Sequence, residues 1–232
     1  MKIYYLPPDV RVLVFDIDMT LYTNQEYLDA QIRLLLQRMA DHQGISFTQV
    51  TNQVALVKAD FAMENDGRNL SLGNVFAELG VDTATSARWR EELFHPEDFL
   101  IEDEKLKSTL KILIQKFKLA AVTNNSTEIG KRTLAALGVE AFFDPVIGLD
   151  ISGKSKPTMI PFEMVTKHHN VAFQQMVSIG DRFDVDLELP LKNGMGAILV
   201  SGAEEVYEIP EIIGKGRRGG RVKGRKGEGE EG

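Results

Sequence analysis

Short runs of consecutive apolar residues recur along the chain, and polar residues follow each of them. Uninterrupted apolar runs of four or five residues are typical of strands in a parallel sheet, because both faces of such a sheet are covered. The pattern predicts four strands and a weaker fifth: residues 11–15, 119–122, 176–179 and 197–200, with 145–147 as the weaker candidate.

Segments with apolar residues at three- and four-residue spacing lie between the later strands. This spacing places the apolar side chains on one face of a helix. It predicts helices over residues 103–116, 127–137, 158–169 and 184–192. Strands that alternate with helices predict an α/β fold, in which a parallel sheet lies between two layers of helices.

Residues 23–102 interrupt this alternation, because they show helical spacing and no convincing strand. The expected helices are residues 26–43, 48–63, 72–79 and 85–94. A crossover between parallel strands needs only about a dozen residues, so we interpret the segment as an all-helical insertion. It follows the carboxyl end of the first strand, the edge at which open α/β sheets bind ligands. We therefore expect a core formed by residues 1–22 and 103–213, with residues 23–102 as a helical lid over it.

Composition narrows the class of protein. Of the 232 residues, 43% are apolar and 26% are charged, which is typical of a soluble globular protein. No apolar run reaches the roughly 18 residues of a membrane-spanning helix, and the first residues lack the apolar stretch of a signal peptide. The absence of cysteine excludes disulfides, thiolate metal sites and a cysteine nucleophile. We expect a cytoplasmic protein with no membrane segment.

The net charge of −7 is unevenly distributed. Residues 214–232 consist almost only of Gly, Lys, Arg and Glu, which cannot form a core, so we expect a disordered tail there. This tail holds seven Lys or Arg and three Glu, which leaves −11 for the first 213 residues. The negative charge of these 213 residues repels nucleic acid and phosphate at long range. A reaction at a phosphate group would therefore need a cation placed close to it. The alternative for the tail is a basic arm that binds nucleic acid.

Polar residues follow the predicted strands at the points where the strands end, and a lysine precedes the helix over 158–169. They are Asp16, Asp18, Thr123, Asn124, Lys156 and Asp181. Because the carboxyl ends of parallel strands meet at one edge of a sheet, we expect these residues to converge. Carboxylate oxygens suit Mg²⁺, and a hydroxyl, an amide and backbone N–H groups suit an anion.

A competing phosphate motif overlaps one of these sites. Residues 148–155, Gly-Leu-Asp-Ile-Ser-Gly-Lys-Ser, fit the G-x-x-x-x-G-K-[ST] pattern of a P-loop. However, Pro157 falls inside what would be the first turn of the P-loop helix, and the remaining chain is short for an NTPase or kinase core. The two interpretations use different lysines: Lys154 would bind phosphate in a P-loop, and Lys156 in the other arrangement.

Four motifs taken together resemble the signature of the haloacid dehalogenase-like hydrolases. They are Asp16-x-Asp18-x-Thr20, Thr123-Asn124, Lys156-Pro157 followed by Phe162, and Gly180-Asp181-x₄-Asp186. The resemblance extends over roughly residues 10–202, and the helical segment after the first motif is similar to the family's C1-type cap. It implies a Rossmann-like core, a three-layer α/β/α arrangement with a parallel sheet, and an inserted all-helical cap domain.

Carried over residue by residue, the resemblance implies roles in phosphoryl transfer. Asp16 would be the nucleophile that forms an aspartyl-phosphate, and Asp18 would be the general acid and base. Family members that act on carbon–halogen bonds generally lack this second aspartate. Thr123 would hold a phosphoryl oxygen, with Asn124 and Thr20 as further phosphate-binding candidates.

The same resemblance implies a metal site. Asp181 would bind Mg²⁺ together with the nucleophile and the backbone carbonyl of Asp18. Lys156 would neutralise the nucleophile and the phosphate. Asp186 would orient this set of residues, with Asp184 as a less favoured substitute.

The chemistry of these roles predicts a Mg²⁺-dependent phosphomonoester hydrolase. An anionic carboxylate must attack an anionic phosphate, so a metal ion and a lysine are needed to offset the repulsion. The expected substrate is a small phosphorylated metabolite, such as a nucleotide, a sugar phosphate or phosphoglycolate, and we expect a monomer or homodimer. A phosphomutase with the same nucleophile is the alternative enzyme, and a non-catalytic nucleic-acid binder is the alternative of another class.

Overall fold

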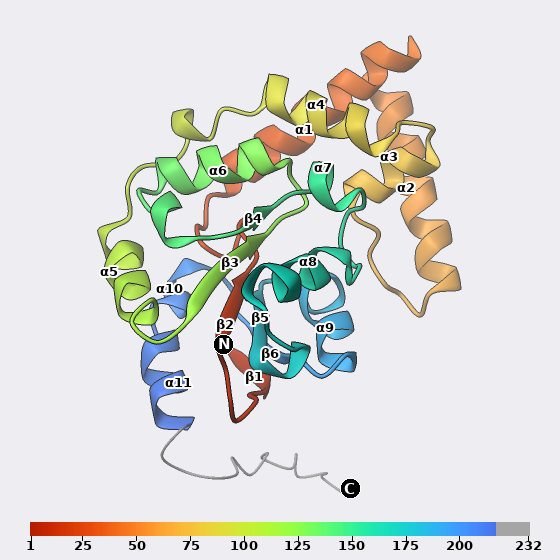
Figure 1. The fold of residues 1–232 in the computed structure, drawn as a ribbon. Coiled ribbons are helices and arrows are strands. Elements are labelled where there is room, and N and C mark those ends of the chain that lie inside the picture. Colours follow the sequence, from red (N-terminus) through yellow and green to blue (C-terminus); the bar gives the residue numbers. More distant parts are fainter. Residues whose placement is uncertain (217–232) are drawn as a thin grey trace, which may run out of the picture.

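The computed structural model describes residues 1–216, which form an α/β fold around one six-stranded sheet (Figure 1). The strands, in order across the sheet, are β1 (Lys2–Tyr5), β6 (Gly196–Leu199), β5 (Met176–Gly180), β2 (Val12–Phe15), β3 (Lys118–Val122) and β4 (Val146–Ile147). The five strands β2 to β6 are parallel, which confirms the expected core. The structure adds one strand that the sequence did not predict, β1, which pairs antiparallel with β6 at the edge of the sheet. Sequence patterning missed β1 because its Ile3 and Tyr5 are exposed, so it has no buried apolar run.

The register at the middle of the sheet brings three strand ends to nearly one level. Phe15, the last residue of β2, pairs with Ala121 of β3 and with Ile179 of β5. Asp16 and Asp181 follow within two residues of these positions. Both therefore emerge at the carboxyl edge of the sheet, where ligand sites of α/β folds lie.

Helices cover both faces of the sheet. Leu13 and Phe15 of β2 belong to the apolar cluster on one face, and Val12 and Val14 to the cluster on the other, as the alternation of side chains along a strand requires. The first face is covered by α5 (Glu104–Leu113), α6 (Thr127–Ala136), α10 (Ala203–Val206) and α11 (Ile209–Gly216), and the second by α8 (Ile160–His169). This is the expected three-layer arrangement.

Four of the five α-helices between β2 and β3 in the chain form a group of their own beside the sheet (Figure 1). They are α1 (Gln25–Gln43), α2 (Phe47–Glu64), α3 (Leu72–Glu78) and α4 (Thr83–Leu93). Their boundaries lie within two residues of those predicted. Met39, Val50, Phe76 and Trp89 contribute to an apolar core that is separate from the two clusters of the sheet. We refer to these helices and the turns between them as the helical insertion.

The remaining elements include several that patterning did not predict. The segment expected to be one helix over 184–192 is a π-helical turn, Phe183–Leu187, followed by α9 (Glu188–Lys192). The short helix α7 (Leu149–Ser152) was also missed, as were α10 and α11. Residues 214–216 of the expected tail complete α11, and residues 217–232 lie outside the described residues. Within residues 1–216, no helix combines the length and the hydropathy needed to cross a membrane.

Candidate active site

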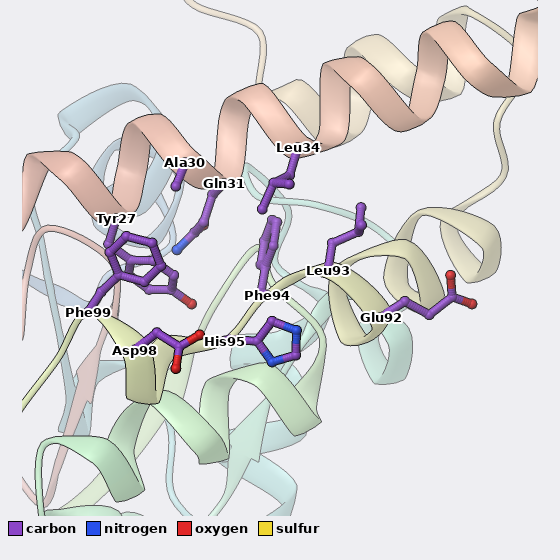
Figure 2. Close-up of a pocket in the computed structure, with 10 residues that line it drawn as sticks. All are labelled: Tyr27, Ala30, Gln31, Leu34, Glu92, Leu93, Phe94, His95, Asp98 and Phe99. Atoms are coloured by element: carbon purple, nitrogen blue, oxygen red, sulfur yellow. The ribbon is translucent and has the colours of Figure 1, made fainter.

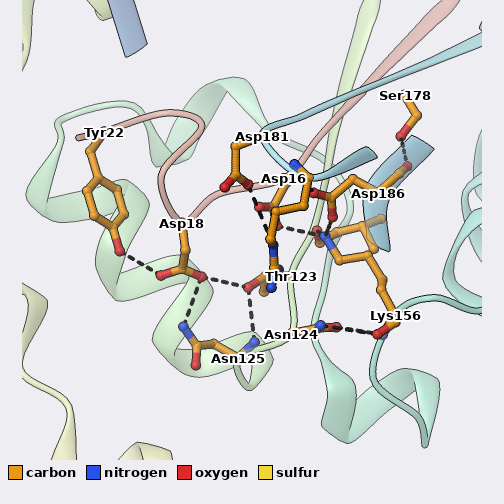
Figure 3. A network of polar contacts seen from close by, with 12 residues as sticks. Asp16, Asp18, Tyr22, Thr123, Asn124, Asn125, Lys156, Ser178, Asp181 and Asp186 are labelled. Atoms are coloured by element: carbon orange, nitrogen blue, oxygen red, sulfur yellow. Dashed lines mark hydrogen bonds and ion pairs between the residues drawn. The ribbon is translucent and has the colours of Figure 1, made fainter. Parts of the chain in front are cut away.

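Lys156 lies at the centre of the polar network at the carboxyl edge of the sheet (Figure 3). Its Nζ atom donates hydrogen bonds to Oδ1 of Asp16 at 2.7 Å, to Oδ1 of Asp186 at 2.7 Å and to the carbonyl oxygen of Val122 at 2.9 Å. These three bonds use all three protons of the ammonium group. Burial would lower the pKa of Lys156, but the carboxylates of Asp16 and Asp186 raise it above its ordinary value. The lysine is therefore held as a buried cation between two carboxylates.

Three carboxylates at this edge have the arrangement of a metal site. Among residues 1–216, one carboxylate oxygen from each of Asp16, Asp181 and Asp186 lies within 4.8 Å of the other two. Oδ2 of Asp16 and Oδ1 of Asp181 are buried and have no hydrogen-bond partner in the described part of the chain. Nε of Arg182 lies 3.9 Å from Oδ1 of Asp181, which is an ion pair but not a hydrogen bond. Buried carboxylate oxygens that lack a hydrogen-bond partner fit a hard divalent cation such as Mg²⁺, which takes oxygen ligands.

Electrostatics supports the same conclusion. Burial raises the pKa of Asp16 well above its ordinary value; Lys156 lowers it, and the neighbouring Asp186 raises it again. Burial and Asp186 likewise raise the pKa of Asp181. A raised pKa means that the charged form of a carboxyl group is disfavoured here, and a bound cation would offset this effect. The residues present therefore fit a divalent metal ion.

Asp186 differs from the other two aspartates because both of its carboxylate oxygens have protein partners. Oδ1 accepts from Lys156, and Oδ2 accepts from the backbone N–H of Arg182 at 3.1 Å. The alternative, Asp184, is directed elsewhere: its Oδ2 accepts from the backbone N–H of Asn69 in the helical insertion. Of the two, only Asp186 lies in the network around Lys156.

Asp18 belongs to an adjoining network (Figure 3). Its Oδ1 accepts from the hydroxyl of Tyr22 at 2.6 Å, and its Oδ2 accepts from Nδ2 of Asn125 at 3.0 Å and Oγ1 of Thr123 at 3.2 Å. Nε2 of Gln31 in α1 adds a longer contact at 3.4 Å. The carboxylate of Asp18 is thus held beside Asp16 but outside the cluster of three aspartates. Sequence reasoning identified Thr123 and missed the other three partners.

The other predicted phosphate-binding residues are placed differently. The amide of Asn124 engages the main chain of Lys156: its Oδ1 accepts from the backbone N–H at 2.6 Å, and its Nδ2 donates to the carbonyl at 3.4 Å. Asn124 therefore fixes the loop that carries the lysine. Thr20 is fully buried, and its Oγ1 has no hydrogen-bond partner within residues 1–216.

The P-loop interpretation does not match the structure. Residues Leu149–Ser152 form helix α7, where a P-loop would need an extended phosphate-binding loop. Lys154 is exposed, and no helix begins until Ile160. The lysine that enters the site is Lys156, as the alternative interpretation required.

A cavity of about 580 Å³ lies between this edge of the sheet and the helical insertion. Asp18, Asn125, Asp181 and Arg182 contribute to its wall from the sheet side. Leu35, Leu36, Val54, Lys58 and Arg90 contribute from α1, α2 and α4. Its volume is in the range of pockets that bind small molecules.

A second hollow, of about 380 Å³, lies where α1 meets the segment that follows α4 (Figure 2). Tyr27, Phe94 and Phe99 make it largely aromatic, and Asp98 and His95 lie at its rim. None of the aspartates of the candidate site lines it. Gln31 lines both hollows and so lies between them.

Comparison with known proteins agrees with this geometry. Residues 10–189 match the family described as haloacid dehalogenase-like hydrolase. The chain is 25% identical to the pyrophosphatase PpaX of Listeria welshimeri over 75% of this chain and 76% of that protein. It is 26% identical to the glyceraldehyde 3-phosphate phosphatase of Methanocaldococcus jannaschii over 80% and 82%.

Solved structures show the same fold. A phosphatase of this superfamily from Thermococcus onnurineus superposes with a TM-score of 0.61 at 21% identity, covering 90% of this chain and all of that one. The family and the enzyme class expected from the sequence are therefore confirmed. The cluster of aspartates around Lys156 lies within a chain that belongs to the haloacid dehalogenase-like hydrolases.

Proposed function

We propose that this protein is a Mg²⁺-dependent phosphomonoester hydrolase in which Asp16 is the nucleophile. The observation that carries the proposal is the position of Asp16, which is buried, bonded to Lys156 through Oδ1, and left with an orphaned Oδ2. Curated relatives named as phosphatases for glyceraldehyde 3-phosphate and phosphoglycolate support the reaction class. The substrate is a small phosphorylated metabolite, for which a cavity of about 580 Å³ is suited.

Asp16 and Asp181 would hold the metal ion, with the backbone carbonyl of Asp18 as a third ligand. The bound cation would supply positive charge that offsets the repulsion between the nucleophile and the phosphate. Lys156 supplies a second, permanent positive charge beside Asp16. Asp186 holds this lysine in place from the opposite side.

The reaction then follows from two carboxylates with separate tasks. A carboxylate oxygen of Asp16 attacks phosphorus, the bond to the ester oxygen breaks, and Asp18 donates a proton to the leaving alkoxide. Water next attacks the aspartyl-phosphate and gives its proton to Asp18. This step releases inorganic phosphate, returns Asp16 to a carboxylate and returns Asp18 to the protonated form from which it started. Thr123 and Tyr22 hold Asp18 at a fixed position for both proton transfers.

The helical insertion would act as a cap in this scheme. Two contacts join it to the segment after Asp181: Arg68 to Glu188 at 3.0 Å, and the backbone N–H of Asn69 to Asp184 at 3.2 Å. Closure over the cavity would exclude water during phosphoryl transfer, and opening would admit it for hydrolysis. The domain boundaries, the cytoplasmic location and the oligomeric state expected from the sequence stay predictions.

The proposal is tested by release of inorganic phosphate from a panel of phosphorylated metabolites, with and without Mg²⁺. Asp16→Asn should abolish turnover and prevent labelling of the acid-quenched protein by a radioactive phosphoryl group. Asp60→Asn, an exposed position on α2, is the matched control. Full activity in Asp16→Asn, after deamidation is excluded by mass spectrometry, would rule out the covalent mechanism. Analysis of the product separates a hydrolase from a phosphomutase, which would return the phosphoryl group to a second hydroxyl.

A further inference from the structure

The cavity beside Asp18 contains a buried cation that the hydrolytic steps do not use. Arg90, in the last turn of α4, is 4% exposed and forms part of the cavity wall. Its Nη1 donates to the carbonyl oxygen of Ser86 at 2.8 Å and to the hydroxyl of the same residue. Within residues 1–216, the guanidinium forms no ion pair with a carboxylate, and Asp18 is the one charged group that affects its pKa.

An arginine in this position is unusual, because it cannot become neutral to avoid the cost of burial. Burial lowers the pKa of Arg90 to about 10, with Asp18 acting in the opposite direction. The side chain therefore stays positively charged at neutral pH. A buried charge is ordinarily compensated by an opposite charge. The hydrogen bonds to Ser86 are neutral, so the compensating anion must come from elsewhere.

The second terminal nitrogen of Arg90, Nη2, lies near the loop of Lys156. Nη2 is 3.7 Å from the position that a Cβ atom would take on Gly73, and that same position is 2.4 Å from Oγ of Ser155. Only a glycine at position 73 allows the side chain of Ser155 to lie so close to the main chain of that residue. The guanidinium is thus located where the helical insertion contacts the residue before Lys156, in the wall of the cavity that also contains Asp18 and Asp181.

We infer that Arg90 binds a second anionic group of the substrate, a carboxylate or phosphate distinct from the phosphoryl group transferred at Asp16. This inference rests on the proposed function and specifies its substrate class. Leu35, Leu36 and Val54 form an apolar part of the same wall and offer no competing polar contact. A charge-assisted, bidentate contact to the guanidinium then distinguishes doubly anionic substrates from phosphomonoesters with a neutral remainder. Lys58, exposed at this cavity, adds to the positive charge available to such a group.

The test compares substrates that differ only in the second group. Phosphoglycolate is assayed against its neutral amide, and the bisphosphate of 1,3-propanediol against the monophosphate. The two pairs distinguish a carboxylate from a phosphate as the group that is bound. The wild-type protein should prefer the doubly anionic member of at least one pair by roughly 30-fold or more in kcat/KM, as expected for a buried charge pair.

The variants are Arg90→Met, Arg90→Lys and, as a matched control, Arg88→Met, which removes an exposed arginine from the same helix. Arg90→Met should reduce the preference to about onefold, mainly through KM, whereas a merely structural role would weaken both members equally. Arg90→Lys should retain part of the preference, and Arg88→Met all of it. Thermal unfolding of each variant verifies that it is folded.

The outcomes separate the inference from the proposed function. Absence of phosphate release from every substrate would overturn the proposed function. Phosphate release with equal kcat/KM for both members of each pair in the wild-type protein would overturn only the inference about Arg90. A preference for the doubly anionic substrate that survives in Arg90→Met would also overturn only the inference about Arg90. Should Arg90→Met fail to fold, the wild-type preference and its partial loss in Arg90→Lys decide the question.

Discussion

The Nζ atom of Lys156 lies 2.7 Å from Oδ1 of Asp16, across 140 positions of the sequence, and each side chain is only 3% exposed. The same ammonium group lies 2.7 Å from Oδ1 of Asp186. The ammonium group of Lys156 is therefore buried together with two carboxyl groups, those of Asp16 and Asp186. Such a group contributes little net stability when complete, but removal of one member leaves an uncompensated buried charge.

Lys156→Met should therefore destabilise the fold by about 3–5 kcal/mol, because Asp16 and Asp186 lose their shared cation. Equilibrium unfolding in urea measures this loss. Lys154→Met is the matched control, since Lys154 is exposed two residues earlier, and it should change stability by less than about 0.5 kcal/mol. Equal effects of the two substitutions would show that the lysine in the network does not compensate the aspartates.

Asp181→Asn should stabilise the metal-free protein by about 0.5–2 kcal/mol, as is typical when a functional charge is removed. Burial and Asp186 raise the pKa of Asp181, so the folded state holds this proton more tightly than the unfolded chain does. The stability that Asp181 gains by holding this proton is fully present below the ordinary carboxyl pKa. It is lost as the pH rises through the raised pKa of the folded state. Above that pKa the folded state carries a buried negative charge at position 181, which costs stability. Asparagine removes this charge, so thermal unfolding in EDTA at pH 7 should show a higher Tm.

Added Mg²⁺ should reverse this order. A ligand present at 100 times its Kd stabilises the folded state by about 2.7 kcal/mol, and only the wild-type protein keeps the full set of carboxylates. We expect its Tm to rise with Mg²⁺ and that of Asp181→Asn to change much less. A wild-type Tm that is independent of Mg²⁺, Mn²⁺ and Ca²⁺ would argue against a metal site at Asp16 and Asp181.

The sequence alone was sufficient to locate the strand ends and the residues that follow them. Buried parallel strands are continuous apolar runs, so the polar residue that ends each run is visible, as at Asp16 and Asp181. Because the strands are parallel, the residues that follow their carboxyl ends lie at the same edge of the sheet. The edge strand β1 was not predictable in this way, because an exposed strand has no such run.

The partners of Asp18 and the burial of Arg90 could not be found from sequence. Gln31 and Asn125 contact Asp18 because α1 and the turn before α6 are directed toward it, and this depends on tertiary packing. Tyr22 is only four residues from Asp18, but its contact depends on the turn that the chain makes between Asp18 and α1. Arg90 lies in a segment, Ala-Arg-Trp-Arg-Glu, where an arginine reads as a surface residue. Among these residues, only Asn125 could be suspected from the sequence, because it lies two residues after Thr123 at the end of a predicted strand.

Tyr22→Phe should lower kcat by about 3- to 10-fold with a smaller effect on KM. The substitution removes the 2.6 Å hydrogen bond to Oδ1 of Asp18 and keeps the ring, whose packing against Tyr27 is independent of the hydroxyl. Asp18 then keeps its bonds to Asn125 and Thr123 but is held less firmly for proton transfer. Single-turnover kinetics measures the effect on each half-reaction. Tyr207→Phe is the control, because it removes a hydroxyl bonded to Asp103, and neither of these residues lines the cavity beside Asp18. A normal kcat in Tyr22→Phe would mean that Tyr22 does not position Asp18.

Gly180→Ala should displace Asp186 and inactivate the enzyme while leaving most of the fold intact. Gly180 ends β5, and a Cβ atom there would lie 2.5 Å from Cβ of Asp186 and 2.8 Å from its Oδ2, closer than nonbonded atoms approach. The aspartate would have to move away from Lys156, and a shift of about 1 Å in such a site costs on the order of 100-fold in turnover. We expect this loss in kcat together with a weaker rise of Tm on addition of Mg²⁺.

Ser178→Ala on the same strand provides the comparison for that variant. It removes the 2.8 Å hydrogen bond from Oγ to the backbone carbonyl of Asp186 but adds no atom near the carboxylate. It should cost about 1 kcal/mol of stability, as loss of a buried hydrogen bond does, and retain most of the turnover. If Gly180→Ala also retained turnover and the Mg²⁺ response, the carboxylate of Asp186 would not be required at its observed position. The orientation of Lys156 would then have to depend on Asp16 and Val122 alone.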